Sequence, residues 1–219
     1  MVLGTILLWV SWLFFNGGSA YGMFESRGSG MPKIMMNTIL AGATGGLVAT
    51  VLKPIVMTSL SFKKFTYDVA ALCNGILAGL VSITGVCNNV DPWAAVVIGF
   101  FGGIFYCLAC KLVLVLGVDD PLEASSVHGA SGMWGLIAVG LFDKSSGIFN
   151  YEAAGSSESW VFLGWQLLGM LIIVLWTSGL SLIYFMIARQ AKILRVTLLD
   201  EVLGLDISEM GASKPKMLS

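Results

Sequence analysis

Residues 119–135 read Asp-Asp-Pro-Leu-Glu-Ala-Ser-Ser-Val-His-Gly-Ala-Ser-Gly-Met-Trp-Gly, and the organisation of the chain follows from this stretch. It has the signals of a helix start, because the Asp120 carboxylate can accept from the free amides of a first turn and proline suits the first helical position. Glu123 stands three residues after Asp120, as in a capping box. The sequence then stays apolar to Phe142. We therefore predict a helix from Pro121 to Phe142, capped by Asp120 and Glu123.

The single histidine of the chain, His128, lies eight residues after this predicted cap. At 1.5 Å per residue, it stands about 12 Å into an apolar helix. Small residues surround it, namely Ala124, Ser125, Gly129, Ser131, Gly132 and Gly135. Such residues let other backbones approach closely inside a bilayer. An ionisable group at membrane depth is costly and is therefore a functional candidate, with a structural hydrogen bond between helices as the alternative role.

The composition is typical of a membrane protein with several spans. Of 219 residues, 57% are hydrophobic and 11% are charged, and the mean hydropathy is +0.87. The net charge of -1 argues against a nucleic-acid surface. The apolar runs contain no carboxylate pair, metal-ligand set or nucleophile–base pair, so we expect neither an enzyme nor a cofactor site.

The four cysteines, Cys73, Cys87, Cys107 and Cys110, lie in or beside apolar runs. We interpret them as small apolar side chains of the membrane core. The Cys107-Leu-Ala-Cys110 spacing leaves a metal or redox role as the alternative, although no second pair of ligands accompanies it.

Six continuous apolar runs are long enough to cross a membrane: residues 2–21, 34–52, 69–87, 93–116, 121–142 and 160–188. A helix needs about 20 residues to cross roughly 30 Å of hydrocarbon, and continuous rather than alternating runs favour helices over strands. The first run lacks a basic leading region, which favours a mature span over a signal peptide. Gly42, Gly45 and Gly46 indicate close helix packing in the second run. We predict an all-α transmembrane domain over residues 1–188 and a tail over residues 189–219.

The basic residues predict the orientation. If the N-terminus is cytoplasmic, the outer loops hold Arg27, Lys33 and Lys144, and the inner segments hold the other nine of the 12 Lys and Arg residues. This bias is the one expected of cytoplasmic loops, so both termini should be cytoplasmic. Lys53 followed by Pro54 is also expected to close the second run.

Three further stretches, together with residues 119–135, resemble a known family. Residues 12–20 read Trp-Leu-Phe-Phe-Asn-Gly-Gly-Ser-Ala, residues 74–84 read Asn-Gly-Ile-Leu-Ala-Gly-Leu-Val-Ser-Ile-Thr, and residues 87–95 read Cys-Asn-Asn-Val-Asp-Pro-Trp-Ala-Ala. These stretches resemble the sixth, eighth, ninth and tenth helices of ammonium transporters, in the Amt branch of the Amt/Rh superfamily. The resemblance extends over almost the whole chain, from the family's sixth to its eleventh helix and its tail. It implies the second of two inverted five-helix repeats plus the last helix of an eleven-helix fold.

The resemblance also implies roles for individual residues. His128 matches one of two histidines that line the substrate pore, Phe15 a phenylalanine that occludes the outer pore, and Ser19 a hydroxyl that recruits ammonium. Trp12 belongs to the same outer gate. These roles are chemically reasonable, because a hydroxyl accepts from an ammonium proton and aromatic faces attract a cation. Residues 16–18, Asn-Gly-Gly, are equally typical of a plain helix end.

Residues 200–211 resemble the cytoplasmic tail of the same family, which docks on the pore bundles and couples neighbouring subunits. Gly204, Asp206 and Gly211 match its pattern, whereas Met210 stands where a histidine is common. A plain solvated tail is the alternative interpretation. The family further implies a homotrimer in the plasma membrane, with ammonium or ammonia as the substrate.

The first repeat of the family, which supplies the second pore histidine and the second gating phenylalanine, has no counterpart in this sequence. In the complete fold, ammonium is recruited outside and loses a proton, and ammonia passes the pore histidines. We therefore interpret the chain as part of an ammonium transporter that contains half of the pore wall and does not transport alone. The alternative is a non-transporting membrane subunit that assembles with full-length relatives and modulates them.

Overall fold

The computed structural model describes residues 1–19, 30–57, 67–149, 156–197, 200–201 and 204, and all regular structure within them is helical. The elements are α1 (Val2–Gly18), α2 (Met31–Met57), α3 (Val69–Thr84), α4 (Pro92–Val115), the π-helical segment η3 (Ser125–Ala130), α5 (Ser131–Phe142) and α6 (Ser157–Gln190). The chain forms two compact units, Met1–Met170 and Leu171–Ser219, and the contacts described below lie within the first.

The predicted all-α class is confirmed, and each predicted apolar run contains a helix. By length and composition, α2, α4 and α6 can cross a membrane, while α1 and α3 are apolar but shorter, at 17 and 16 residues. The expectation of six membrane crossings therefore stays a prediction.

Two predicted helix bounds were wrong. The second run does not close at Lys53 and Pro54, because α2 continues through Pro54 to Met57. A proline this close to a helix end removes one backbone hydrogen bond without affecting a long helical segment beyond it. The fifth run does not begin at Pro121, because Pro121 and Leu122 form a turn and helical structure starts at Ala124.

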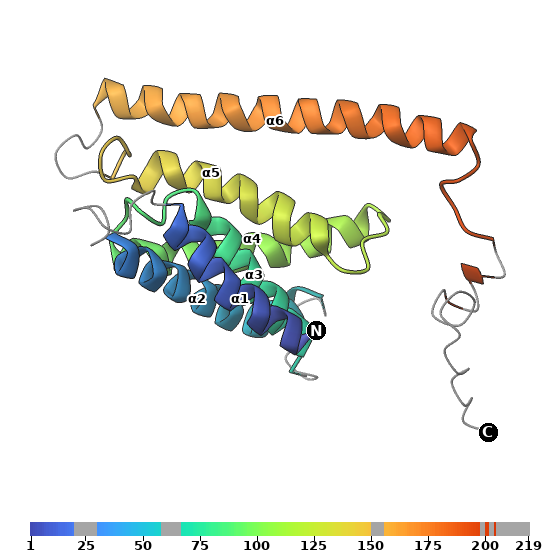
Figure 1. Cartoon of the computed structure of the whole chain (residues 1–219), viewed down its shortest axis with the longest axis horizontal. Helices are drawn as coiled ribbons and strands as arrows, with labels where there is room; N and C mark the ends of the chain where they lie inside the picture. Colours follow the sequence, from blue (N-terminus) through green and yellow to red (C-terminus); the bar gives the residue numbers. More distant parts are fainter. Residues whose placement is uncertain (20–29, 58–66, 150–155, 198–199, 202–203, 205–219) are drawn as a thin grey trace. The chain divides into compact units, whose positions relative to one another are not determined.

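Helices α2, α3 and α4 pack backbone against backbone around Ala41, as the glycine spacing of the second run predicted. A Cβ atom added to Gly79 of α3 would lie 2.2 Å from the Ala41 carbonyl oxygen, and one on Gly99 of α4 would lie 2.3 Å from it. A Cβ on Gly45 would lie 2.5 Å from the carbonyl oxygen of Gly75. Helices this close require glycine at the contact, and α2, with α3 and α4 on it, makes the most extensive helix contacts of the unit (Figure 1).

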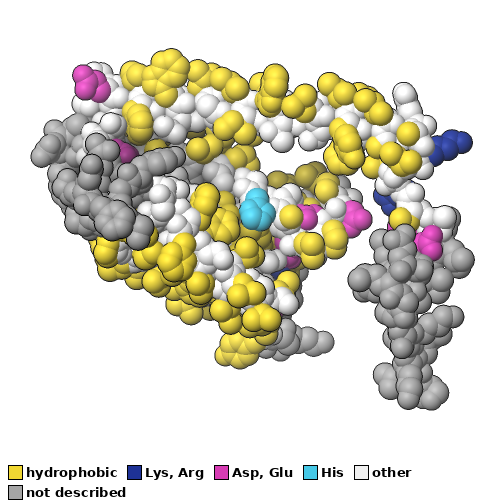
Figure 2. Space-filling model, in the orientation of Figure 1, with side chains coloured by type: hydrophobic (Ala, Val, Ile, Leu, Met, Phe, Trp, Pro, Cys, Tyr) yellow, Lys and Arg dark blue, Asp and Glu magenta, His cyan; other side chains and the backbone are white. Residues whose placement is uncertain are grey.

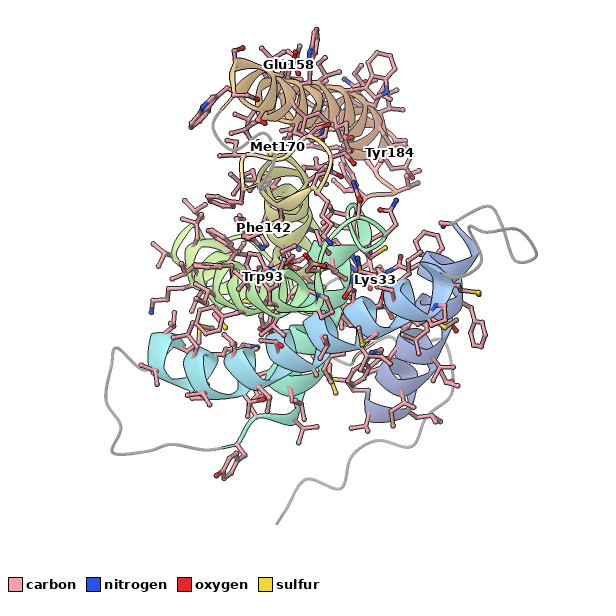
Figure 3. All side chains as sticks on the ribbon, turned by 90° about the vertical axis from the view of Figure 1, so that its left-hand side faces the viewer. Lys33, Trp93, Phe142, Glu158, Met170 and Tyr184 are labelled. Carbon is pink, nitrogen blue, oxygen red and sulfur yellow. The ribbon has the colours of Figure 1, made fainter. Side chains whose placement is uncertain are left out.

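Helix α1 lies against α2 and α3, while α5 lies against α3 and α4 (Figure 1). The turn between α3 and α4 is fixed from α2, because the buried Asn37 amide donates to the carbonyls of Cys87 and Val90 at 2.9 and 3.1 Å. Trp93, at the start of α4, meets Phe142, at the end of α5, edge to face at 6.0 Å (Figure 3). The π-helical segment η3 thus leads directly into α5, and the ring contact of Phe142 holds the other end of α5.

All four cysteines are buried and free, which agrees with their interpretation as small core side chains. An unmodified thiol prefers an apolar site, and the buried positions of these cysteines provide one.

Candidate functional site

His128 lies in the π-helical segment η3, between the turn after α4 and the start of α5. π-Helical turns are rare and are found mostly at functional sites. Ser126 and Val127 of this segment are buried against the helices of the unit, whereas His128 and Gly129 are exposed. The segment therefore presents the imidazole outward.

A groove of about 300 Å³ runs beside His128. Its lining comes from three elements and their approaches: Met1, Gly4, Thr5 and Leu8 at α1, Asn74 and Leu77 of α3, and Leu122, Ala124, Val127 and His128 around η3. Figure 2 shows the histidine on an open face of the molecule, among largely hydrophobic side chains. The groove is thus an open, largely apolar surface with a few polar groups, of which the imidazole is the most versatile hydrogen-bonding one.

The α1 wall of this groove continues to the predicted outer-gate residues. Thr5 and Leu8 line the groove, and Trp12, Phe15 and Ser19 follow them at alternating spacings of four and three residues. This spacing keeps all five side chains on one face of a helix. From Thr5 to Ser19 that face extends over about 20 Å. The three residues predicted from the family pattern therefore share one stripe with the wall that faces His128.

The three predicted outer-gate residues also contact one another. The rings of Trp12 and Phe15 meet edge to face at 6.3 Å, and Phe15 is 60% exposed. Trp12 Nε1 donates to the Thr84 hydroxyl at 2.8 Å, which ties the indole to the end of α3. The Ser19 hydroxyl donates to the Phe15 carbonyl at 2.7 Å. Ser19 thus closes α1 and keeps its oxygen lone pairs for a further donor.

The expected close packing around His128 is found on one side only. A Cβ added to Gly135 would lie 2.9 Å from the Ser82 carbonyl oxygen, so α3 approaches the helix there. The same atom on Gly129 would meet nothing within 4 Å, and on Gly132 its nearest contact is Val81 at 3.7 Å. Within the described residues, no backbone approaches Gly129 or Gly132 closely, so a role of these two glycines in close packing stays a prediction.

Asp120 does cap the helix, although the helix begins later than predicted. Its carboxylate accepts from the amides of Ala124 and Ser125 at 2.9 and 3.0 Å. The Ser125 hydroxyl also donates to it, and this bond, with the amides, holds the pKa of Asp120 below its ordinary value.

Glu123 is not part of a capping box, and its side chain turns into the protein. The carboxylate binds Lys53 Nζ at 2.6 Å through Oε1, while Oε2 accepts from the Tyr106 hydroxyl at 2.5 Å and from the Asn74 amide at 2.9 Å. We refer to Glu123, Lys53, Tyr106 and Asn74 as the Glu123 cluster. Tyr106 is fully buried and Lys53 is 6% exposed. Sequence reasoning missed this cluster, although a lysine in an apolar run is a signal that a buried partner exists.

The Glu123 cluster adjoins the histidine groove. Asn74 donates to Glu123 and also lines the groove beside His128. One α3 side chain therefore contacts the ion pair and the groove at once.

The predicted tail residues are only partly described. Gly204 is exposed and has a positive φ of 84°, which a glycine adopts without strain. Asp206 and Gly211 lie outside the described residues.

The sequence profile of the Ammonium Transporter Family matches residues 1–214. The chain belongs to this family of membrane transporters. Ammonium transporter 1 member 3 of Solanum lycopersicum is 34% identical over 96% of this chain and 48% of its own length. A candidate ammonium transporter of Synechocystis sp. is 40% identical over 97% of this chain and 36% of that protein. Thus the chain spans about a third to a half of the curated relatives it matches, and these are transporters rather than enzymes.

Solved structures of the same family share the fold. A sensor Amt protein superimposes with a TM-score of 0.79 at 35% identity, over 95% of this chain and 48% of that one. Mep2 of Saccharomyces cerevisiae superimposes with a TM-score of 0.71 at 32% identity, over 89% of this chain and 43% of that one. The recognised resemblance to ammonium transporters is therefore confirmed at the level of the family.

Proposed function

We propose that this chain forms one wall of an ammonium-conducting pathway, with His128 as the histidine that the substrate passes. The observation that carries the proposal is the position of an exposed imidazole on the wall of an apolar groove of about 300 Å³. Family membership supplies the substrate class, ammonium or ammonia.

The chemistry of the groove favours ammonia over ammonium in its interior. A bare ammonium ion loses its hydration in an apolar channel, which is costly, whereas neutral ammonia needs only one or two hydrogen bonds. A neutral imidazole can both donate and accept, so His128 can bind ammonia or relay a proton. In this proposal, Trp12, Phe15 and Ser19 form the outer gate, where ring faces and the hydroxyl stabilise the cation before it loses a proton.

The finer features of the family fold belong to the same proposal. The six apolar runs cross the membrane, the chain matches the second repeat and last helix of the family, and both termini are cytoplasmic. The complementary half of the pathway comes from the family's first repeat, and the complete protein is a plasma-membrane homotrimer. Gly204, Asp206 and Gly211 of the tail couple neighbouring subunits, and Asp120 caps the pore helix.

The test compares the chain alone with a chimera that completes the pathway. The first half of the Solanum lycopersicum relative is fused to residues 1–219, and both proteins are expressed in yeast cells that lack ammonium transporters. We expect no uptake of labelled methylammonium by the chain alone and clear uptake by the chimera. His128→Ala should lower chimera uptake by about a hundredfold, the scale of a lost proton-transfer group.

Thr50→Val is the matched control, because it removes a hydroxyl that donates to the Gly46 carbonyl of its own helix at 2.8 Å. This variant should retain uptake. Uptake by residues 1–219 alone would contradict the half-wall proposal. Full chimera activity in His128→Ala would contradict the role of the histidine. An effect of the chain on a co-expressed full-length relative, without chimera transport, would favour the modulating subunit instead.

A further inference from the structure

Glu123 has an unusual backbone. Its φ is +58°, in the left-handed region that residues other than glycine seldom adopt. Such conformations persist where surrounding contacts hold them, and they cluster at functional sites. The side chain of Glu123 supplies these contacts, because both of its carboxylate oxygens are bound within the Glu123 cluster.

Three different helices hold this one carboxylate. Lys53 comes from α2, Asn74 from α3 and Tyr106 from α4, and Lys53 Nζ also donates to the Tyr106 hydroxyl at 3.0 Å. Because α2, α3 and α4 pack closely through glycine contacts, the three donors come from one tightly packed group of helices. The position of Glu123 is thus fixed from three directions.

The backbone of Glu123 carries this constraint into the helix that follows. Its carbonyl accepts from the Val127 amide at 2.9 Å, which starts the helical bonding directly before His128. Successive residues of a helical segment are related by a regular rotation, so the orientation of the first turn sets the direction of the side chains after it. His128 therefore lies about one helical turn after Glu123, whose position is fixed.

The segment separates two cavities. Ala124, Val127 and His128 line the histidine groove, while Asp120, Glu123 and Ser126 line a second cavity of about 110 Å³. Residues of the two sets alternate along the chain, so a rotation of part of a turn would move His128 away from the groove. A contact that fixes this rotation therefore determines the direction of His128, in addition to any effect on the stability of the protein.

We propose that Glu123 is a positioning residue, which the other members of the Glu123 cluster hold so that the η3 segment directs His128 into the groove. The consequence for transport rests on the function proposed above. The geometric claim stands independently, because it concerns the direction of one imidazole in the chain itself.

The single histidine makes a direct test possible. The full 219-residue chain is placed in lipid nanodiscs and treated with diethylpyrocarbonate, and the modified His128 peptide is followed by mass spectrometry. Glu123→Gln keeps the size of the side chain and removes its charge. The modification rate of His128 should change by about tenfold, the factor expected for the loss of a charged hydrogen bond.

Two more variants separate positioning from stability. Tyr106→Phe removes one hydroxyl donor and leaves the Lys53–Glu123 pair, so it should shift the rate in the same direction but less. Asp91→Asn removes a lysine-paired carboxylate near the start of α4, and it should leave the rate unchanged. An unchanged rate in both Glu123→Gln and Tyr106→Phe, with wild-type helicity, would overturn the proposal. If Glu123→Gln does not fold, Tyr106→Phe decides alone.

The transport assay distinguishes this proposal from the one on which it rests. Failure of every chimera to transport would contradict the proposed function and leave the His128 modification rates interpretable. A chimera in which Glu123→Gln transports normally while the modification rate has shifted would show that the direction of His128 does not govern conduction.

Discussion

The two ends of helices α2, α3 and α4 each carry a lysine–carboxylate pair, and the two pairs differ in burial rather than distance. Lys53 lies 2.6 Å from Glu123, and Lys144 lies 2.6 Å from Asp91. The Lys53 and Glu123 side chains are 8% and 23% exposed, against 47% and 32% for Lys144 and Asp91. The two pairs have the same length, but the Lys53–Glu123 pair is largely shielded from water and the Lys144–Asp91 pair is in contact with it.

Distance alone therefore does not determine how much an ion pair contributes to the free energy of unfolding. A buried charge that loses its partner keeps its desolvation cost, so breaking a buried pair is strongly destabilising. An exposed charge is rehydrated when its partner is removed, and such pairs contribute little. We expect the Lys53–Glu123 pair to hold structure and the Lys144–Asp91 pair to add only a small stabilisation.

The largest effect is expected for Lys53→Met. This change leaves the Glu123 carboxylate without its cation, and the free energy of unfolding should fall by about 3–5 kcal/mol. Denaturant titration in detergent micelles, followed by far-ultraviolet circular dichroism, measures the loss. Lys144→Met is the control and should cost less than about 1 kcal/mol. Equal losses for both variants would contradict the assignment by burial.

Removal of both charges should restore much of that stability. In Lys53→Met combined with Glu123→Gln, no buried ion is left without its partner, while Tyr106 and Asn74 can still donate to the new amide oxygen. Asp68, whose carboxylate lies 3.8 Å from Lys53 Nζ, is 43% exposed and stays hydrated in the double variant. The coupling energy of the two changes should be about 1–3 kcal/mol, in the direction that favours the double variant. The same titration on the wild type, both single variants and the double variant provides it, and strictly additive losses would contradict the expectation.

Burial should also determine how much neutral hydrogen bonds near Asp91 contribute to the free energy of unfolding. Asn37 is fully buried and holds the carbonyls of Cys87 and Val90. Asn37→Leu leaves both carbonyls without this donor, and the free energy of unfolding should fall by about 1–3 kcal/mol. Asn89→Ala is the matched control, because the Asn89 amide is half-buried and donates to Asp143 at 2.8 Å. A larger loss in Asn89→Ala than in Asn37→Leu would contradict the role of burial.

The helices and the family could be predicted from the sequence, because both depend on local signals. Apolar length predicted the helical runs, and glycine spacing predicted the close packing of the second run. The family motifs identified ammonium transporters, which the family profile confirms over residues 1–214.

The Glu123 cluster could not be predicted from the same local signals. Asp120, Pro121 and Glu123 have the spacing of a capping box, yet the partner of Glu123 is Lys53, 70 residues away. A tertiary contact to a buried charge outweighs a surface cap, so Glu123 turns inward and the helix starts after it. The π-helical form of η3 has no comparable sequence signal.

The smallest effect concerns the pH dependence of the exposed pair. The Lys144 ammonium, which donates to Asp91, is the main cause that lowers the pKa of this carboxyl from its ordinary value of 3.8. A carboxyl whose folded pKa is depressed adds stability above its unfolded pKa, and this contribution disappears as the pH falls through the folded value. Because Asp91 is about a third exposed, the contribution should be at most about 1 kcal/mol.

Asp91→Asn tests this directly. Its free energy of unfolding should lie slightly below that of the wild type at neutral pH, and the gap should close as the pH falls below 3.8. Raising the salt concentration at neutral pH should narrow the same gap, because an exposed pair is screened. Glu123→Gln is the counterpart in the buried pair, and salt should change its loss far less. A gap between wild type and Asp91→Asn that changes with neither pH nor salt would show that Asp91 does not act through its charge.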